Sequence, residues 1–453
     1  MSDKDIRVAL VHLGCARNLI DSETILGRLG ARGYRLTRDL EEADVAVLNT
    51  CSFIGPARDE SEAAIRDLLA RKEAGRLRGV VVAGCLAEKF RAEVEERFPA
   101  VDALIGLSDY SNIARVVESV LRGRKVRPGD GGRPLDGSSL ETIRLLQTPR
   151  SYAYLRPSHG CDHDCAFCII PAIRGRQRSK PPEAVAAEAE ALTAQGVREI
   201  VLVAEDTTGY GADLGPGGPR LPELVETLAE VPGLRWLRVM YAYPNAFPWR
   251  LTEVMRERSA VLPYLDIPIQ HIATPVLARM RRGGSSDSVR RLLQRLRDEV
   301  PGIALRTTVL VGHPGEGERE FAELLDFLAE FRFERLGAFA FSPEAGTPAG
   351  EDPDRCPPEQ AQERLAAVME LQAGIHAEHQ RSLVGSELDC LIDGRAGAAA
   401  VGRGPADAPE VDGVVRIPDP ERRLAAGDFV RVQVTAAAGY DLEAEAIRTV
   451  PAP

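Results

Sequence analysis

Runs of aliphatic residues alternate with amphipathic stretches through the first 122 residues of the chain. The runs at residues 8–12, 44–48 and 79–83 are short and rich in valine, leucine and alanine, as strands are, and helical patterns fill the intervals between them. Alternation of strand and helix is typical of an α/β fold built on a parallel sheet. We therefore predict an N-terminal α/β parallel-sheet domain over residues 1–122.

The pattern is interrupted at residues 123–150, which are dense in glycine, proline and charge and are predicted to be a linker. From residue 151 the alternation resumes in longer units, which indicates a large parallel sheet or an open barrel with its site at the carboxyl ends of the strands. A long helix over 358–383 is expected near the end of this domain, which we place at 151–380. The six predicted strands lie at residues 152–156, 199–203, 236–241, 264–268, 304–310 and 336–341.

The last part of the chain, residues 381–453, changes character. Short strand-like runs at 387–392, 413–417, 428–434 and 443–447 are separated by turns of glycine, proline and aspartate. Short strands with such turns are typical of a small β-barrel.

Composition narrows the function classes. The 453 residues are 44% hydrophobic and 28% charged, contain no apolar stretch of membrane-spanning length and begin with a charged segment, so we expect a cytoplasmic protein without a signal peptide. In a reducing compartment the eight cysteines are first considered as metal ligands or catalytic groups. The net charge of −11 argues against binding nucleic acid through a broad basic face, and favours a basic protein partner.

Three cysteines follow the first strand of the central domain. Cys161, Cys165 and Cys168 have C-x3-C-x2-C spacing. A cubane iron–sulfur cluster has four irons, so three thiolates leave one iron free to chelate the amino and carboxylate groups of S-adenosylmethionine (SAM). An electron from such a cluster can cleave SAM to a radical that removes hydrogen from unactivated carbon.

The alternative interpretation of this motif is a zinc site formed by the same cysteines with His159 or His163, since zinc takes these ligands in tetrahedral geometry. The loop stands at the front of six strand–helix units, which favours a catalytic loop over a separate zinc module. His163 itself is expected to be a solvent-facing or capping residue.

Three further cysteines lie far apart in sequence but at equivalent positions. Cys15, Cys51 and Cys85 each follow a predicted strand, in VALVHLGC, VAVLNTC and VVVAGC. Parallel strands bring their carboxyl ends together, so the three thiols are predicted to hold a second cluster in the crevice there. Each alone would be interpreted as a buried structural cysteine, as we interpret Cys356 and Cys390.

Together these motifs closely resemble the methylthiotransferase family of radical-SAM enzymes over essentially the whole chain. The resemblance implies three domains, with an N-terminal cluster domain, a central partial (β/α)6 radical-SAM barrel and a C-terminal β-barrel of the TRAM type. It also implies two [4Fe–4S] clusters on the six cysteines above, SAM as cofactor, and an electron donor of the flavodoxin or ferredoxin type. The same likeness suggests that Phe167, Asp206, Thr207 and Gly312 contact SAM. The alternatives are a core role for Phe167 and a plain strand-to-helix turn at Gly312.

Within that family one branch modifies an aspartate of small-subunit ribosomal protein twelve at its β-carbon, and another modifies a tRNA adenosine beside the anticodon. The chain is more similar to the ribosomal-protein branch, although Glu205 stands where glutamine is usual and His313 where an aromatic residue is usual. The residues that carry this likeness are GCARNLIDSE (14–23), CAFCIIPAIRGRQRS (165–179), EDTTGYG (205–211), YAYP (241–244), DIPIQH (266–271), MRRG (280–283), RTTVLVGHPGE (306–316), APEVDG (408–413), GDFV (427–430) and YDLEAE (440–445).

The charge of the C-terminal segment agrees with a protein target. Residues 382–453 carry 12 acidic and 7 basic side chains, a balance of −5, which suits a basic ribosomal protein better than an RNA backbone. Two alternatives stay open from the sequence: the tRNA branch, and a non-catalytic RNA-binding protein with structural zinc.

Overall fold

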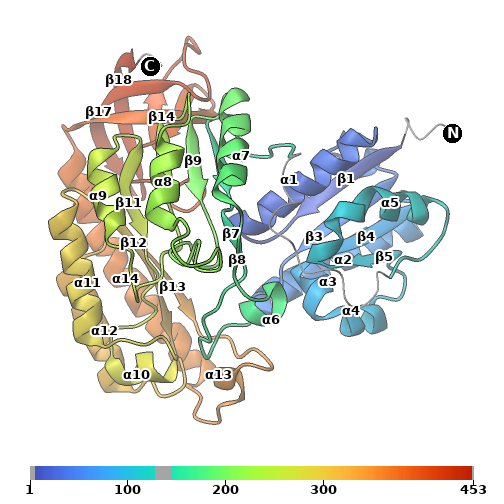
Figure 1. Cartoon of the computed structure of the whole chain (residues 1–453), viewed down its shortest axis with the longest axis horizontal. Helices are drawn as coiled ribbons and strands as arrows, with labels where there is room; N and C mark the ends of the chain where they lie inside the picture. The colour runs from blue at the N-terminus through green and yellow to red at the C-terminus, as the bar shows by residue number, and fades with distance from the viewer. Residues whose placement is uncertain (1–5, 128–143, 451–453) are drawn as a thin grey trace.

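The computed structural model describes residues 6–127 and 144–450, so much of the predicted linker lies outside the described residues. Figure 1 shows an N-terminal α/β part, drawn in blue, beside a larger central sheet, with a small barrel, drawn in red, at one end of that sheet. In the part of the chain that is described, we find no helix with the length and apolar character needed to cross a membrane.

The N-terminal part is a five-stranded parallel sheet with the order β2-β1-β3-β4-β5. The order reverses beside β1, which makes a switch point of the kind where ligands bind in open α/β sheets. The three predicted strands are present, and two three-residue strands, β2 and β5, were not predicted. The strands are β1 (Arg7–His12), β2 (Arg35–Thr37), β3 (Val45–Thr50), β4 (Gly79–Gly84) and β5 (Ala103–Ile105).

Helices cover both faces of this sheet. One face packs against α1 (Ala16–Ala31) and α5 (Ile113–Leu121), and the other against α2 (Gly55–Glu73) and α4 (Arg91–Arg97). The strands β3 and β4 are therefore buried along their whole length, as expected from the apolar runs at residues 45–48 and 80–83. The remaining elements are α3 (Cys85–Lys89) and the 3-10 turns η2 (Leu40–Glu42) and η3 (Leu107–Asn112).

The central part is a six-stranded parallel sheet in sequential order, β13-β12-β11-β10-β9-β6, which curves into an open half-barrel. All six predicted strands are present within a few residues. They are β6 (Tyr152–Leu155), β9 (Glu199–Leu202), β10 (Trp236–Val239), β11 (Val261–Asp266), β12 (Ala304–Val311) and β13 (Arg335–Ala340).

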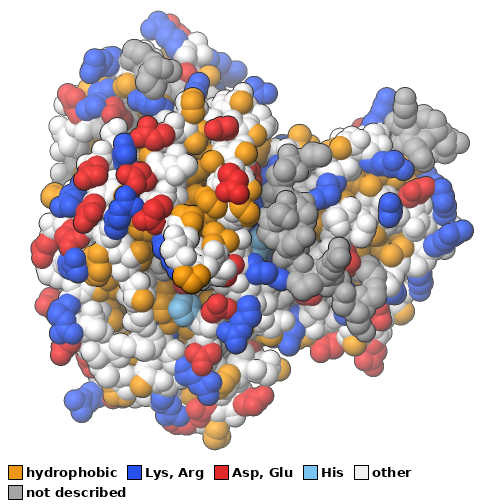
Figure 2. Space-filling view, viewed as in Figure 1, with side chains coloured by type: hydrophobic (Ala, Val, Ile, Leu, Met, Phe, Trp, Pro, Cys, Tyr) orange, Lys and Arg blue, Asp and Glu red, His pale blue; other side chains and the backbone are white. Residues whose placement is uncertain are grey.

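Amphipathic helices cover the outside of the half-barrel. Arg250 of α9 and Arg258, just after α9, form ion pairs with glutamates of α8 and of the turn after it, and Figure 2 shows such mixed charges over this face. The long helix α14 has the bounds that were predicted, Pro358–Leu383. The other helices are α6 (Ile170–Arg174), α7 (Pro182–Ala194), α8 (Leu221–Ala229), α9 (Arg250–Glu257), α10 (Thr274–Arg279), α11 (Ser286–Glu299), α12 (Glu318–Phe331) and α13 (Pro348–Glu351), with a two-stranded sheet of β7 (Ser158–His159) and β8 (Arg178–Ser179).

The C-terminal part is a closed five-stranded barrel, as predicted. One strand, β15, was missed because its sequence AAVGR contains little except alanine, glycine and one valine. The strands are β14 (Glu387–Ala396), β15 (Ala399–Arg403), β16 (Val415–Pro418), β17 (Phe429–Ala438) and β18 (Asp441–Val450).

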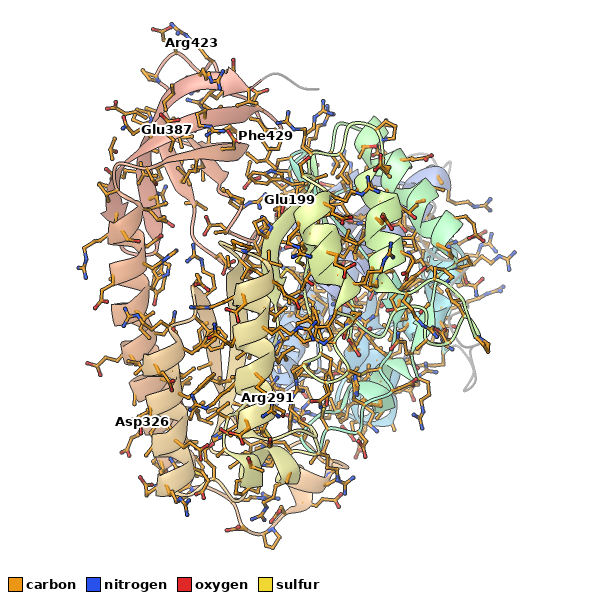
Figure 3. All side chains as sticks on the ribbon, turned by 60° about the vertical axis from the view of Figure 1, so that its left-hand side comes forward. Glu199, Arg291, Asp326, Glu387, Arg423 and Phe429 are labelled. Atoms are coloured by element: carbon orange, nitrogen blue, oxygen red, sulfur yellow. The ribbon has the colours of Figure 1, made fainter. Side chains whose placement is uncertain are left out.

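A buried ionic network joins this barrel to the half-barrel. Glu199, at the start of β9, pairs with Arg238 and with Arg403, each at 2.7 Å, and all three side chains are at most 2% exposed. Figure 3 places Glu199 at the junction of the two parts. Because breaking a buried pair leaves an uncompensated charge, this network holds the barrel in a fixed place.

A loop between β15 and β16, residues 404–413, enters the concave side of the half-barrel; we call it the inserted loop. The hydroxyl groups of Tyr152 and Tyr154 donate to the Glu410 carboxylate at 3.1 and 3.0 Å, and the Tyr264 hydroxyl donates to Asp412 at 2.8 Å. The family-like motif APEVDG thus packs against β6 and β11, with Ala408 and Pro409 buried and Glu410 and Val411 exposed.

Candidate functional site

The central cysteine motif forms a loop between β7 and α6. Its backbone is fixed at both ends, because Cys161 N–H donates to the Gly175 carbonyl at 3.1 Å and Ala166 N–H donates to the Met280 carbonyl at 2.9 Å. Gly160 has a φ of +74°, and a Cβ there would lie 2.2 Å from the Arg176 carbonyl oxygen, so only glycine fits before Cys161. These contacts hold the loop in place at both of its ends.

The pKa values of these thiols reflect their burial. Burial, followed by the charges of Asp206 and the neighbouring cysteines, raises the pKa of Cys161 to about 12. Burial and Cys165 raise the pKa of Cys168 to about 11. Buried thiols of this kind are suited to metal or cluster binding, in which the bound iron supplies the positive charge that favours the thiolate.

The three N-terminal cysteines come together as the strand pattern predicted. Cys15 precedes α1, Cys51 follows β3, and Cys85 is the first residue of α3 directly after β4. The segment before Cys15 lies very close to Cys51: a Cβ on Gly14, whose φ is +104°, would lie 2.9 Å from the Cβ of Cys51.

The thiols of this triad differ in their electrostatics. Burial alone would raise the pKa of Cys15, but the guanidinium groups of Arg17 and Arg174 outweigh it and the pKa is lowered. Burial raises the pKa of Cys51, and burial with the nearby thiols raises that of Cys85 to about 11. Cys15 is thus the thiol of the triad most readily ionised.

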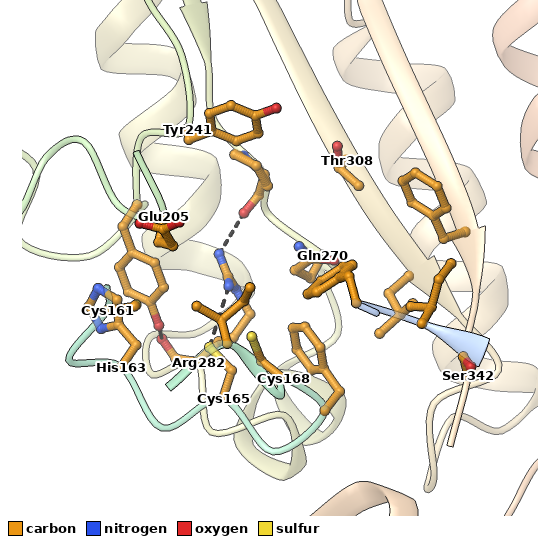
Figure 4. A pocket seen from close by; sticks show the side chains of 18 of the residues that line it. Cys161, His163, Cys165, Cys168, Glu205, Tyr241, Gln270, Arg282, Thr308 and Ser342 are labelled. Atoms are coloured by element: carbon orange, nitrogen blue, oxygen red, sulfur yellow. Dashed lines mark hydrogen bonds between the residues drawn. The ribbon is translucent and has the colours of Figure 1, made fainter. Parts of the chain in front are cut away.

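A cavity of about 340 Å³ lies where the N-terminal part meets the carboxyl end of the half-barrel. Arg17, Phe53 and Ile54 contribute to its wall from the N-terminal side, and the central triad and the ends of β12 and β13 form the rest. Its wall is mostly apolar, with a few charged groups. Figure 4 shows the residues that define it, among them Cys161, Cys165, Cys168, Glu205, Tyr241, Gln270, Arg282, Thr308 and Ser342.

Arg282 supports the central triad from within this cavity. Its Nη1 donates to Cys165 Sγ at 3.6 Å and its Nη2 donates to the Pro268 carbonyl at 2.6 Å, as the dashed lines in Figure 4 mark. The guanidinium also lies 4.6 Å from the centre of the Tyr243 ring, on which His163 stacks at 3.6 Å. His163 also lines the cavity, and it is held in place there by its contact with Asp206 at 2.8 Å.

The four residues predicted to contact SAM are differently placed. Phe167 lines the cavity. Asp206 accepts hydrogen bonds from Thr208 and the Gly209 N–H, and the buried Thr207 hydroxyl donates to the Met240 carbonyl at 2.6 Å. Gly312 packs against Ala361 of α14. These contacts give the last three a structural role, and their contact with SAM stays a prediction.

The contacts of Glu205 and His313, the two departures from the family pattern, explain how the fold accommodates them. Glu205 Oε2 accepts from the Gly160 N–H at 2.9 Å, while Oε1 faces the Nε atoms of Arg174 at 3.5 Å and of Arg17 at 3.8 Å, so its extra charge is balanced. His313 is 1% exposed and packs between the rings of Phe167 and Phe341. Burial lowers the pKa of His313 to about 4, which keeps the ring neutral, as an aromatic residue would be.

A set of buried charges between the two triads was missed from the sequence. Asp21 pairs with Arg156 at 2.7 Å and with Arg174 at 3.0 Å. Glu205 in turn pairs with both Arg174 and Arg17. We call these five residues the arginine bridge. Arg17 and Arg174 each lie within six residues of a cluster cysteine, which was a usable signal, but their common target could not be seen without the fold.

The residues present fit iron–sulfur clusters better than single metal ions. In residues 6–127 and 144–450, no three His, Cys, Asp or Glu side chains lie close enough to bind one metal ion, and this holds for both cysteine triads as well as for His159 and His163. A cluster presents separate irons to its thiolates. Two buried polar atoms beside the triads, Arg174 Nη1 and Glu205 Oε1, have no hydrogen-bond partner in the structure.

Comparison with known proteins decides the family. Residues 7–106 match the family described as "Uncharacterized protein family UPF0004", residues 155–328 the "Radical SAM superfamily" and residues 384–447 the "TRAM domain". The "Ribosomal protein uS12 methylthiotransferase RimO" of Anaeromyxobacter sp. (strain Fw109-5) is 46% identical over 98% of this chain and 94% of that protein. The protein of the same name from Geobacter sulfurreducens is 41% identical over 99% and 100%.

This chain belongs to the RimO family. Its members named above span the whole chain, so the likeness covers both cysteine triads and the barrel. They favour the ribosomal-protein branch over the tRNA branch.

A solved structure supports the same fold at greater distance. The radical SAM methyltransferase TsrM from Kitasatospora setae superposes with a TM-score of 0.56 at 17% identity, covering 94% of this chain and 84% of that one. The RimO-family chain thus shares an architecture with radical SAM enzymes well beyond its own family.

Proposed function

We propose that this protein is a radical-SAM methylthiotransferase that adds a methylthio group to the β-carbon of an aspartate in small-subunit ribosomal protein uS12. The observation that carries the proposal is the 46% identity, over 98% of the chain, to a protein named for this reaction. The two cysteine triads on either side of the arginine bridge support it independently, because sulfur insertion at unactivated carbon needs both a radical source and a sulfur carrier.

In this proposal Cys161, Cys165 and Cys168 hold the SAM-cleaving [4Fe–4S] cluster, and Cys15, Cys51 and Cys85 hold the second. When bound, the clusters supply the electron for reductive cleavage of SAM and the sulfur for transfer, and a second SAM supplies the methyl group.

The protein's own residues orient these groups and exclude water. Arg282 donates to Cys165 and fixes the loop against the Tyr243 ring. Phe53 from the N-terminal part and Phe339 from β13 line the cavity and are 41% and 54% exposed, so they offer apolar surface to an incoming target segment. A largely apolar cavity protects a radical from side reactions with solvent.

The C-terminal barrel is proposed to steer the basic ribosomal protein. Many of its acidic residues are already paired, as Asp419 is with Arg395 and Asp389 with Arg431. The exposed Glu443 and Glu445 alternate along β18 with the buried Leu442 and Ala444, and so present negative charge outward. Such charges raise the association rate with a basic partner and are weakened by salt.

Charge reversal tests this role. We expect E443K/E445K to lower kcat/KM for uS12 several-fold at low salt, with kcat and deoxyadenosine formation in the absence of uS12 unchanged, because long-range attraction affects encounter and not chemistry. E93K/E96K, an equal change at exposed positions of α4, is the matched control. If the two double variants had equal effects on kcat/KM at all salt concentrations, the proposed role of the barrel in docking uS12 would be wrong.

We further propose that the enzyme works in the cytoplasm and takes electrons from a donor of the flavodoxin or ferredoxin type. Both follow from the chemistry, since the clusters and the ribosomal target need a reducing compartment with low-potential carriers.

The central experiment is anaerobic reconstitution followed by intact-mass analysis of uS12 and of tRNA offered in parallel. We expect a methylthio adduct on uS12, located by fragmentation to the β-carbon of one aspartate. An adduct on tRNA with unmodified uS12 would favour the tRNA alternative, and a zinc-loaded protein that never cleaves SAM would favour a non-catalytic protein.

A further inference from the structure

Arg174 connects the two cysteine triads physically. It is the last residue of α6, the helix that begins two residues after Cys168. Its Nη2 donates to Asp21 Oδ2 at 3.0 Å and to Cys85 Sγ at 3.6 Å. A side chain carried by the loop of the central triad therefore contacts a thiol of the N-terminal triad.

This arginine is deeply buried and incompletely satisfied. Arg174 is 4% exposed, and its Nη1 has no hydrogen-bond partner. A buried donor without an acceptor costs free energy unless a ligand supplies one. Sulfur atoms of a cluster held by Cys85 would be such acceptors, because Arg174 already contacts the Cys85 thiol through its other terminal nitrogen, Nη2.

Arg174 belongs to a group of buried charges beside the N-terminal triad. This arginine bridge contains three cations, Arg17, Arg156 and Arg174, and two anions, Asp21 and Glu205. The positive charge of Arg174 lies next to the Cys85 thiol, where a cluster bound by three thiolates would add negative charge.

We propose that Arg174 is a positioning residue that raises the reduction potential of the cluster on Cys15, Cys51 and Cys85. A hydrogen bond to a ligand sulfur and a nearby positive charge both stabilise the reduced, more negative state of a cluster. This inference rests on the ligand assignment made under the proposed function.

The test isolates that cluster in the full-length chain with the variant C161A/C165A/C168A and measures its midpoint potential by an EPR-monitored redox titration. R174Q in this background is expected to lower the reduced-to-oxidised ratio at a fixed potential at least tenfold, which is about 59 mV for a one-electron couple. R174K keeps the charge but loses the planar fork, so a smaller shift in the same direction is expected.

R282Q in the same background is the matched control. Arg282 is also buried and contacts a thiol at 3.6 Å, but that thiol is Cys165 of the other triad. We expect it to leave the midpoint of the N-terminal cluster unchanged.

The possible results distinguish the role of Arg174 from the assignment of the cluster ligands. An unchanged midpoint in R174Q and R174K, or an equal shift in R282Q, would overturn the role of Arg174 while leaving the cluster assignment intact. If R174Q does not fold by circular dichroism, R174K decides alone, and an unchanged midpoint there overturns the role. Absence of a [4Fe–4S] signal from the parent triple variant would overturn the ligand assignment and this inference together.

Discussion

The two cysteine triads are brought together in different ways, one by a single loop and the other by three strands of a sheet. Cys161, Cys165 and Cys168 lie within one eight-residue loop, whose shape is fixed by local hydrogen bonds. Cys15, Cys51 and Cys85 each follow a different strand of the N-terminal sheet, and their convergence depends on the register of β1, β3 and β4. The first triad is a local property of the sequence, whereas the second is a property of the whole N-terminal sheet.

The largest expected effect separates the roles of the two triads. C161A/C165A/C168A should abolish deoxyadenosine formation, because no site for SAM cleavage remains. C15A/C51A/C85A should keep deoxyadenosine formation but yield no methylthio product, because the sulfur carrier is lost. Chromatography of deoxyadenosine and mass analysis of uS12 measure both. Methylthio product from the second variant would exclude the N-terminal triad from the reaction.

A smaller effect is expected from glycine substitutions beside the two triads, which should weaken cluster binding at one triad each. G14A adds a methyl group that would lie 2.9 Å from the Cys51 Cβ, and G160A adds one that would lie 2.2 Å from a backbone oxygen. We expect G14A to reduce iron content selectively at the N-terminal triad and G160A at the central one, by roughly tenfold in cluster affinity, since displaced supporting contacts commonly cost that much. Iron and sulfide analysis in the two triple-cysteine backgrounds reports each site.

G33A is the control for these glycine variants. Gly33 also has a positive φ, +96°, but a Cβ there would meet no atom within 4 Å. It should lower stability slightly and leave both clusters intact. Equal iron loss in G33A would mean that backbone strain, and not the approach of the cysteines, explains the result.

The smallest expected effect is a change in the unfolding free energy at acid pH, caused by His313 of the central part. The folded pKa of His313 is about 4, below an unfolded value near 6.5. The folded state thus favours the neutral ring, so its contribution is complete above pH 6.5 and is lost as the pH falls toward 4. Between pH 7 and 5 the wild-type protein, without clusters, should lose on the order of 2 kcal/mol more unfolding free energy than H313F. Urea titrations measure this, and parallel pH profiles would contradict it.

The sequence predicted much of this arrangement because its strongest signals are periodic or local. The bounds of α14, the six strands of the half-barrel and the positions of all six cysteines after strands could be inferred from patterns of apolar residues and turns. The strands β2 and β5 were missed because each has only three residues, and β15 because its sequence contains little except alanine, glycine and one valine.

Side-chain convergence was the part that the pattern could not reveal. Asp21, Arg174 and Glu205 come from segments separated by 31 or more residues, and nothing in their spacing indicates that they meet. Likewise, APEVDG could be identified as a motif, but its position inside the half-barrel depends on three tyrosines from β6 and β11.

The inserted loop has a consequence for protein engineering. Because Tyr152, Tyr154 and Tyr264 use their hydroxyl groups to hold Glu410 and Asp412, the C-terminal barrel cannot be exchanged between relatives as an independent cassette. A chimera would have to carry these tyrosines along with residues 404–413, or Glu410 and Asp412 would lose these hydrogen-bond donors. Sequence changes on the two sides of this boundary are therefore expected to be inherited together.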